Sequence, residues 1–279
     1  MKRIPKVLVV SGSDSSGGAG MQADINMCRY CGVYPLSAVS CITVQSPLGL
    51  SAIEAVTPDI FRMQLESSLI GDAPDAVKVG MLPYEQHLEI LINFLRDSNL
   101  HNVVVDPIFA PTLGQDKMPR SCWYNSLLVA EILPMITLLT PNIPEFKKLS
   151  ALPERNIVDS DIGSFLFRYG LKALLLKGGH AHIQELPVVT DKLYIAQDMS
   201  DNDYHPHIFN NKKILTNNTH GTGCHLSSLI AANLAKGVDL YEAVSVSELT
   251  LNRFLKTNAA LQFCPADSAL RGPVAIINP

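Results

Sequence analysis

The feature that most constrains the fold is the alternation of short apolar segments with amphipathic segments along the chain. Six apolar segments have the length and composition of buried strands: Val7–Val10, Ala38–Val44, Ala76–Val79, Asn102–Val105, Ile136–Leu139 and Ala173–Leu176. Helical patterns lie between them, for example at Ile60–Ile70, His87–Leu95 and Leu127–Ile132. Buried strands that alternate with helices are typical of a largely parallel sheet that helices cover on both faces. The sequence therefore predicts an α/β fold.

Two further segments extend this prediction toward the C-terminus. Tyr241–Leu261 has the pattern of a long final helix. The stretch Asp198–Asn211 is rich in Asp, Asn and His. We expect a surface hairpin or loop there, because the stretch is too long for a tight turn.

A glycine-rich loop follows the first apolar segment. It reads Ser-Gly-Ser-Asp-Ser-Ser-Gly-Gly-Ala-Gly from Ser11 to Gly20, and a helical pattern begins at Met21. The spacing excludes a standard P-loop, because Gly18 and Ala19 occupy the positions where that motif has Lys and Ser or Thr. The glycines allow a ligand to approach the backbone closely, but they serve a tight strand-to-helix turn equally well.

A second glycine loop, Asn218-Thr-His-Gly-Thr-Gly-Cys224, precedes an apolar run with helical spacing. The backbone N–H groups of Gly221, Thr222 and Gly223 would then lie at the positive end of the helix dipole. Anions such as phosphate bind at that position. The alternative is an ordinary glycine-rich loop before a core helix.

The composition limits the classes of function. The chain has 279 residues, of which 47% are hydrophobic, and a formal net charge of −4. A chain of this length forms one large α/β domain or two small ones. It has no basic stripe of the kind that binds nucleic acid, and no apolar run reaches the ~20 residues of a membrane span. The apolar stretch after the basic start is too short for a signal peptide, so we expect a cytoplasmic protein with no nucleic-acid or membrane partner.

The six cysteines are scattered along the chain. A chain of this size builds its core without a disulfide framework. Cys28 and Cys31 have the spacing of zinc and redox sites, but no second pair accompanies them. Because structural zinc takes four ligands, we favour two small residues on a helix face.

Six short sequence motifs occur in this order along the chain: Ser11–Asp24, Val77–Leu82, Val105–Pro107, Leu139–Glu145, Leu176–His180 and Asn218–Cys224. Together they resemble the bacterial hydroxymethylpyrimidine and phosphomethylpyrimidine kinases of the ribokinase-like superfamily, and Arg271–Val274 resembles the closing segment of that family. The resemblance covers essentially the whole chain. It implies a single ribokinase-like domain over residues 1–279, a three-layer α/β/α fold with a central, mostly parallel sheet, and a homodimer.

The resemblance also implies a reaction. It is the ATP-dependent phosphorylation, with Mg²⁺, of 4-amino-5-hydroxymethyl-2-methylpyrimidine and of its monophosphate, for thiamine diphosphate biosynthesis. Such a transfer depends mainly on positioning and electrostatics, because charge develops on the transferred phosphoryl group.

Several of these motifs place polar residues directly after a predicted strand. Ligands of open parallel sheets bind beyond the carboxyl ends of the strands. That rule brings one set of residues to a single edge of the sheet: Ser11–Gly20, Gln45, Gly80, Met81, Asp106, Asn142–Glu145 and Lys177–Gly179. The sequence therefore predicts the ligand site at this edge.

The resemblance gives the site residues separate roles. The pyrimidine site would contain Gly12, Asp24, Gln45, Gly80 and Met81. The ATP site would contain Lys177, Asn218 and His220, and the metal ligands would be Asp106 and Glu145. The amide of Gln45 offers a donor and an acceptor together, which suits an aminopyrimidine edge. The alternatives are a polar strand end for Gln45, a helix-surface carboxylate for Asp24, and turn or helix capping for the two metal ligands.

Cys224 stands where the wider superfamily usually has an aspartate base, and the resembled pyrimidine kinases also have Cys there. The start of a helix lowers a thiol pKa, so we expect a thiolate that assists deprotonation of the substrate alcohol. Gly221, Thr222 and Gly223 would supply the catalytic anion hole beside it. The alternative is a small buried residue that lets the loop close, and we expect the adjacent His225 to face solvent or packing.

The chain departs from the family pattern at three places. Asn26 replaces a common Lys, the run Ile108–Gly114 lacks a Lys-Ser-Gly, and His225 replaces the usual Thr. These departures affect the expected rate, the handling of the nucleotide and the second phosphorylation, but they leave the main phosphate loop in place. Three activities remain open. They are a pyrimidine kinase, a pyridoxal or pyridoxine kinase, and a catalytically weakened relative that senses pyrimidine or nucleotide.

Overall fold

The computed structural model of the chain describes residues 3–46, 48–109, 121–152, 156–179, 187–199, 204–263 and 272–274. The sequence predictions that involve Ala110–Gly114, His180, Cys264 and Arg271 lie outside these ranges.

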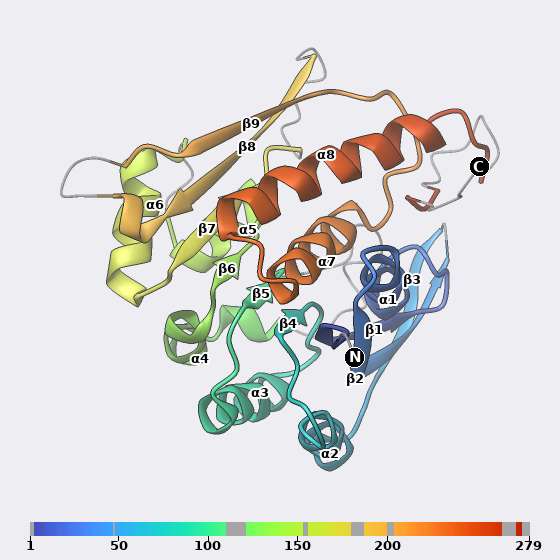
Figure 1. Ribbon diagram of the computed structural model, residues 1–279, viewed down its shortest axis with the longest axis vertical. Coiled ribbons are helices and arrows are strands. Elements are labelled where there is room, and N and C mark those ends of the chain that lie inside the picture. The colour runs from blue at the N-terminus through green and yellow to red at the C-terminus, as the bar shows by residue number, and fades with distance from the viewer. Residues whose placement is uncertain are drawn as a thin grey trace.

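A nine-stranded sheet forms the centre of the described chain (Figure 1). Its strands are β1 (Lys6–Asp14), β2 (Tyr34–Ser46), β3 (Gly49–Ala55), β4 (Ala76–Val79), β5 (Val103–Val105), β6 (Leu138–Leu139), β7 (Ala173–Leu176), β8 (Val188–Ile195) and β9 (His207–Lys212). Their order across the sheet is β3-β2-β1-β4-β5-β6-β7-β8-β9. The central strands are parallel to one another, in the order β2-β1-β4-β5-β6-β7. At one end of the sheet β3 pairs antiparallel with β2, and at the other end β8 pairs antiparallel with β7 and β9 with β8. The predicted mostly parallel sheet is confirmed.

Helices cover both faces of this sheet (Figure 1). In the described ranges they are α1 (Gly20–Tyr30), α2 (Pro58–Ser67), α3 (Glu85–Ser98), α4 (Ser126–Ile132), α5 (Ile143–Ser150), α6 (Asp159–Tyr169), α7 (Thr222–Ala235) and α8 (Leu240–Asn258). The helices α1, α7 and α8 pack on one face, and α2 to α6 pack on the other. The chain is therefore the three-layer α/β/α structure that the sequence predicts.

Strand β1 shows why the predicted strands read as continuous apolar runs. Val7 and Val9 lie in the core beneath α1 and α7, whereas Leu8 and Val10 lie in the core on the opposite face. Successive side chains of a strand point to opposite faces, so a strand covered on both sides is apolar at every position.

The strands that the sequence analysis missed lie toward the two ends of the sheet. These are β3, β8 and β9, and each pairs antiparallel with a neighbour. Residues along β9 alternate between half-buried and exposed, so this strand lacks a strong apolar signal. Within the polar stretch from residue 198 to 211, the strand residues from His207 onward pair with β8, which confirms the hairpin alternative for that part. The predicted final helix is confirmed as α8, whereas α5 and α6 were not predicted.

The two closely spaced cysteines have no metal-binding partners in the described part of the chain. Cys28 is buried in α1, Cys31 follows the last turn of that helix, and both are free thiols. Within the described ranges, no group of three or more His, Cys, Asp or Glu side chains is arranged to hold a metal ion. Cys28 lies on a helix face as predicted, whereas Cys31 is the C-cap residue that follows α1.

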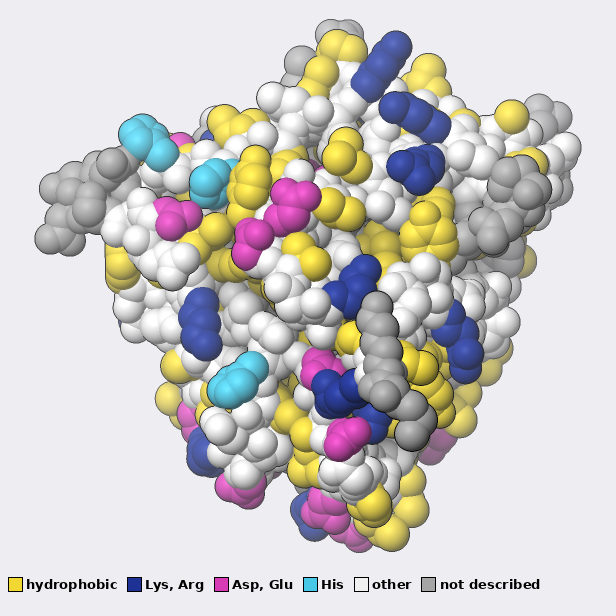
Figure 2. All heavy atoms as spheres, viewed as in Figure 1, with side chains coloured by type: hydrophobic (Ala, Val, Ile, Leu, Met, Phe, Trp, Pro, Cys, Tyr) yellow, Lys and Arg dark blue, Asp and Glu magenta, His cyan; other side chains and the backbone are white. Residues whose placement is uncertain are grey.

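The surface and the helix lengths bear on the expected partners. None of the helices within the described ranges combines the length and the apolar character that crossing a membrane requires. Figure 2 shows basic and acidic side chains scattered over the face that it draws, with apolar side chains between them.

Candidate active site

The first turn of α7 presents backbone N–H groups at the carboxyl edge of the sheet. Gly221 is the N-cap residue, with a φ of 85°, and a Cβ atom there would collide with the backbone carbonyl of Gly18. Glycine is therefore required where the two glycine loops touch. At Gly223, an added Cβ atom would lie 3.2 Å from Asp106 Oδ2 and 3.2 Å from Lys177 Nζ. The bare Cα atom of Gly223 thus lies against the Asp106 carboxylate and the Lys177 ammonium.

The charged groups opposite α7 are Asp106, Glu145 and Lys177, which we call the phosphate-side cluster. Asp106 follows β5 and Lys177 follows β7, and the Lys177 ammonium donates to Asp106 Oδ1 at 2.8 Å. Glu145 lies in the first turn of α5. Its carboxylate accepts the backbone N–H of Asn142 at 2.8 Å, and the Asn142 side chain accepts the backbone N–H of Glu145 at 2.9 Å. This capping box holds Glu145 beside the ion pair.

Electrostatics in this cluster leave one carboxylate poorly compensated. Burial raises the pKa of Glu145 to about 7, Lys177 opposes the rise, and the Asp106 carboxylate adds to it. Burial alone would lower the pKa of Lys177, but Asp106 and Glu145 raise it above its ordinary value, so the ammonium stays charged. Two carboxylates against one ammonium suit a divalent cation, since Mg²⁺ is commonly held by one or two carboxylates together with substrate phosphates. The donor set therefore fits Mg²⁺.

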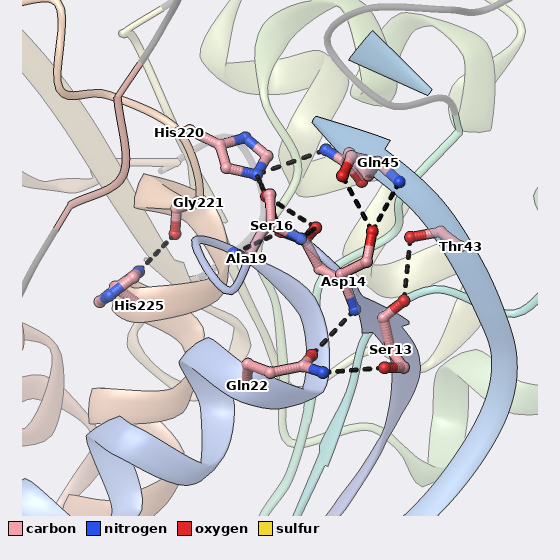
Figure 3. Close-up of polar contacts among 11 residues, drawn as sticks. Ser13, Asp14, Ser16, Ala19, Gln22, Thr43, Gln45, His220, Gly221 and His225 are labelled. Atoms are coloured by element: carbon pink, nitrogen blue, oxygen red, sulfur yellow. Dashed lines mark hydrogen bonds and ion pairs between the residues drawn. The ribbon is translucent and has the colours of Figure 1, made fainter. Parts of the chain in front are cut away.

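A second polar group, which we call the ring-side network, consists of Asp14, Ser16, Gln45 and His220 (Figure 3). Asp14 ends β1, and its carboxylate accepts the backbone N–H groups of Ser16 and Ala19, each at 2.8 Å. Burial raises the pKa of Asp14, but hydrogen bonds from His220 and Ser16 outweigh it and bring the pKa down to about 2. The first glycine loop is therefore folded around an ionised carboxylate.

Three of the predicted pyrimidine-site residues lie toward the carboxyl ends of the paired strands β1 and β4. An added Cβ atom at Gly12 would lie 2.7 Å from Cys41 Sγ and 3.6 Å from Met81 Sδ. One at Gly80 would lie 2.7 Å from Ser11 Oγ. Met81 is buried, and its carbonyl accepts the Ser40 hydroxyl at 2.6 Å. The structure thus brings Gly12, Gly80 and Met81 together, as the predicted site requires.

Asp24 lies deeper than the sequence analysis anticipated. It is fully buried, and its two carboxylate oxygens accept from Lys78 Nζ at 2.7 Å and from Ser228 Oγ at 2.7 Å. The alternative of a helix-surface carboxylate is wrong, because α1 turns this residue inward against β4 and α7. The geometry does not support direct contact with a substrate either, since both oxygens are used inside the protein. We call Asp24, Lys78 and Ser228 the buried triad.

The structure also changes the assignments of two predicted nucleotide residues. Asn218 is buried, and its amide donates to the backbone carbonyls of Asn258 and Leu261 at 2.7 and 2.8 Å. It therefore ties the second glycine loop to the end of α8, and its hydrogen-bond donors are not available to a nucleotide. His220 belongs to the ring-side network next to Gln45, whereas Lys177 alone of these three residues lies in the phosphate-side cluster.

The prediction that the helix start lowers the thiol pKa of Cys224 is wrong. Burial raises this pKa to about 11; Lys78 opposes the rise, and the carboxylates of Asp24 and Asp106 add to it. The group is a thiol at neutral pH. His225 is also buried, which lowers its pKa to about 4, and its Nδ1 atom lies 2.8 Å from the Gly221 carbonyl oxygen. The neutral ring donates there, so His225 faces packing rather than solvent.

A pair of carboxyl groups supports the Lys177 loop from behind. Asp191 Oδ1 accepts the Gly178 backbone N–H at 2.7 Å, and Glu248 Oε2 accepts the Asn211 amide at 2.9 Å. Burial and the neighbouring Asp191 charge raise the pKa of Glu248 to about 9. Glu248 is therefore protonated at neutral pH.

The structural roles of five residues were not predicted from the sequence: Asp14, Lys78, Ser228, Asp191 and Glu248. One signal was available for Lys78: a single lysine in the apolar run Ala76–Val79 must be paired if that run is a buried strand. No comparable signal marks Glu248, because its partner lies on a strand that the sequence did not predict.

Comparison with known proteins identifies the family of the chain. The phosphomethylpyrimidine kinase family profile matches residues 14–265. The hydroxymethylpyrimidine/phosphomethylpyrimidine kinase of Staphylococcus aureus is 31% identical over 97% of this chain and 93% of its own length. A thiamine biosynthetic bifunctional enzyme of Arabidopsis thaliana is 34% identical over 89% of this chain. The match spans 46% of that plant protein, so the chain corresponds to somewhat less than half of it.

Solved structures show the same architecture. The ADP complex of Bacillus subtilis pyridoxal kinase has a TM-score of 0.79 and 27% identity, with 97% of each chain covered. The phosphomethylpyrimidine kinase of Clostridium difficile has a TM-score of 0.70 and 29% identity, with 90% of this chain and 99% of that one covered. The fold, the two glycine loops and the sequence matches agree, and this chain belongs to the phosphomethylpyrimidine kinase family.

Proposed function

We propose that the chain phosphorylates 4-amino-5-hydroxymethyl-2-methylpyrimidine and its monophosphate with ATP, as an enzyme of thiamine diphosphate biosynthesis. One observation carries the proposal. Gly223, in the first turn of α7, faces Asp106 and Lys177. Gln45 and His220 form a separate contact along the same edge of the sheet. A phosphate donor and a ring with a hydroxymethyl group need two such halves side by side.

The phosphate half would act by positioning and charge. The N–H groups at the start of α7 and the Lys177 ammonium would accept the negative charge that develops on the transferred phosphoryl group. Because Gly223 has no side chain, no Cβ atom covers the backbone N–H groups of this turn. Mg²⁺ bound by Asp106 and Glu145 would supply further neutralisation of the phosphate oxygens.

The ring half would orient the acceptor hydroxyl. Gln45 would contact the ring, with Gly12, Gly80 and Met81 forming the adjacent wall. The Cys224 thiol would close the loop between ring and phosphate rather than act as the base, because its pKa of about 11 keeps it protonated at neutral pH. A substrate hydroxyl held in line with the phosphate loses its proton late in such a loose transition state, so a strong base is not required.

A second candidate is supported by the structural neighbours. The pyridoxal kinase of B. subtilis superposes with a TM-score of 0.79, compared with 0.70 for the C. difficile phosphomethylpyrimidine kinase. Pyridoxal also carries a hydroxymethyl group on a nitrogen ring. Phosphorylation of pyridoxal by the same site is therefore the alternative activity.

Steady-state ADP formation with hydroxymethylpyrimidine, its monophosphate and pyridoxal would test both candidates. We expect the largest kcat/KM for hydroxymethylpyrimidine. A larger kcat/KM for pyridoxal would replace the first candidate with the second. Melting shifts without turnover would favour a binding protein, because ligands that bind the folded state stabilise it.

Two further proposals follow from the family resemblance. We propose a homodimer, which sedimentation velocity of the full chain would detect as one species of twice the monomer mass. We also propose a cytoplasmic location without nucleic-acid partners, which fractionation of cells that express the chain would test.

A further inference from the structure

Three polar partners converge on one ring nitrogen of His220 (Figure 3). The Nε2 atom lies 2.9 Å from Asp14 Oδ2, 3.4 Å from Ser16 Oγ and 3.3 Å from Gln45 Nε2. The His220 side chain is 18% exposed and that of Asp14 is 4% exposed, so protein groups replace most of the water around them. A ring nitrogen carries either a hydrogen or a lone pair. It therefore cannot satisfy both a carboxylate and an amide NH₂ group.

Asp14 decides which form is present. Its carboxylate has a pKa of about 2, so it is ionised at neutral pH and can only accept hydrogen bonds. Backbone N–H groups of Ser16 and Ala19 fix it in place. A lone pair on Nε2 would face this negative charge, whereas an Nε2–H group donates to it. Nε2 therefore carries a hydrogen in both cases, when the ring is neutral and when both of its nitrogens carry hydrogens.

The orientation of Gln45 then follows from His220. If His220 Nε2 carries a hydrogen, an NH₂ group of Gln45 beside it would place two hydrogen-bond donors against each other, with no acceptor between them. Turning the amide by 180° exchanges its oxygen and nitrogen with little change in shape. The oxygen then accepts from His220, and the NH₂ group turns to the opposite side. Mutual hydrogen bonds between the Ser15 hydroxyl and the Gln45 backbone hold the end of β2, so only the side chain needs to turn.

We propose that Asp14 and His220 are positioning residues that hold the Gln45 amide with its NH₂ group toward the ring pocket, so that the site selects a ring with a hydrogen-bond acceptor at that position. The acceptor is a ring nitrogen rather than an exocyclic amino group. The inference rests on the proposed function, in which Gln45 contacts the ring. It also changes the expectation that this amide offers a donor and an acceptor together, because His220 uses the acceptor.

The first test needs no substrate. Imidazole ¹⁵N shifts of His220 in the full chain, assigned by comparison with His220→Gln, report which ring nitrogen carries hydrogen. We expect a protonated Nε2 in the wild type and in Ser16→Ala, a control that keeps the Asp14 charge. A pyridine-like Nε2 would overturn the proposal, whatever substrate the protein phosphorylates.

The second test uses Gln45→Glu, which keeps an oxygen for His220 and replaces the NH₂ group with a second oxygen. We expect calorimetric binding of hydroxymethylpyrimidine to weaken by about tenfold or more, which corresponds to about 1.4 kcal/mol. If Gln45 instead presented its oxygen to the amino group, the variant would bind as well as the wild type. That outcome would overturn the proposal.

Ring analogues separate reading of the ring from general damage to the pocket. Two analogues replace one or the other ring nitrogen of hydroxymethylpyrimidine by C–H. For one of these analogues, we expect the Kd for the wild type to be about tenfold higher than that of the parent compound. The Kd of the same analogue for Gln45→Glu should lie within about twofold of its Kd for the wild type. Equal losses for parent and both analogues in Gln45→Glu would contradict the proposal. If wild type binds pyridoxal and no pyrimidine, the proposed function fails, and pyridoxal with its ring C–H analogue decides the inference in the same way.

Discussion

The two halves of the site solve different problems with charged side chains. In the ring-side network a single carboxylate, Asp14, is surrounded by donors, and its charge fixes the direction of the neighbouring hydrogen bonds. In the phosphate-side cluster, Asp106 and Glu145 share one ammonium, and the Cα atom of Gly223 lies against the ion pair without a side chain. The first half has its charge satisfied and its geometry fixed. The second keeps an excess of negative charge, which the cation of a phosphate donor can use.

The largest expected effect concerns the buried triad, which joins the two halves. Lys78→Met leaves Asp24 without its ion-pair partner in the interior. We expect the free energy of unfolding to fall by about 3–5 kcal/mol, the cost of leaving a buried charge uncompensated. Urea denaturation would measure it. The double variant Lys78→Met/Asp24→Asn is the matched control, because it removes both charges and should lose less stability than the single variant.

This variant also tests whether the halves depend on each other. The triad connects α1 and β4 with α7, so a loosened triad should weaken ring binding and nucleotide binding together. Loss of nucleotide binding alone would show that the two halves are independent. A loss of stability below about 1 kcal/mol would contradict the assigned role, because that is the range of an exposed ion pair.

The next effect lies in the phosphate half alone. Gly223→Val adds a branched side chain at a position where even a Cβ atom would lie 3.2 Å from Asp106 Oδ2 and from Lys177 Nζ. We expect kcat/KM to fall by about 100-fold or more, the range for losing a preorganised anion site, while ring binding changes little. Steady-state kinetics and calorimetry would measure these quantities, with Gly223→Ala as the smaller step. Near-normal turnover in a folded Gly223→Val protein would remove this loop from the mechanism.

The contrast between the halves also marks what the sequence could predict. The strand–helix alternation predicted the three layers, and the rule for strand ends brought Gln45, Asp106, Glu145 and Lys177 to one edge of the sheet. These predictions depend on local pattern and on the topology of parallel sheets. Glycine at positions 221 and 223 was recognisable for the same reason, since a helix start that binds anions needs bare backbone.

What could not be predicted depends on burial and on pairs distant in sequence. The raised pKa of Cys224 follows from its burial, to which the carboxylates of Asp24 and Asp106 add, rather than from its helix start. The sequence suggested Asn218 as a nucleotide ligand, but its amide donates hydrogen bonds to backbone carbonyls at the end of α8. Each error came from assigning a role from position along the chain, when the partner lies on another element.

A third effect separates the halves by pH. The pKa of Glu248, behind the Lys177 loop, is raised to about 9, so the folded state holds a proton that the unfolded state releases above its ordinary pKa of 4.5. Stability therefore falls as pH rises from about 4.5 to 9, by up to about 1.4 kcal/mol per pH unit. Asp14 acts oppositely. Its pKa is lowered from 3.8 to about 2, so its contribution is lost as pH falls through that range.

Glu248→Gln tests this assignment. The glutamine keeps the size and shape of the side chain but cannot ionise, so the alkaline loss of stability should become shallower while the acid side stays unchanged. Thermal melting of the variant and the wild type across the pH range would measure both slopes. If stability still fell with the same slope on the alkaline side in the variant, groups other than Glu248 would account for that loss. A change on the acid side would contradict the separation of the two halves.

The smallest expected effect is at Cys224, where the two halves meet. Because its pKa of about 11 leaves it protonated, Cys224→Ser should change kcat by less than about tenfold. Cys224→Asp should lose more, since a third carboxylate near Asp24 and Asp106 would repel the phosphate. Measured kcat for both variants, with KM checked to separate binding from chemistry, decides the point. A thiolate base would reverse the order: serine would cost about 100-fold or more and aspartate would retain activity. In that case nucleotide binding must lower the thiol pKa, and the phosphate half would supply the base as well as the charge.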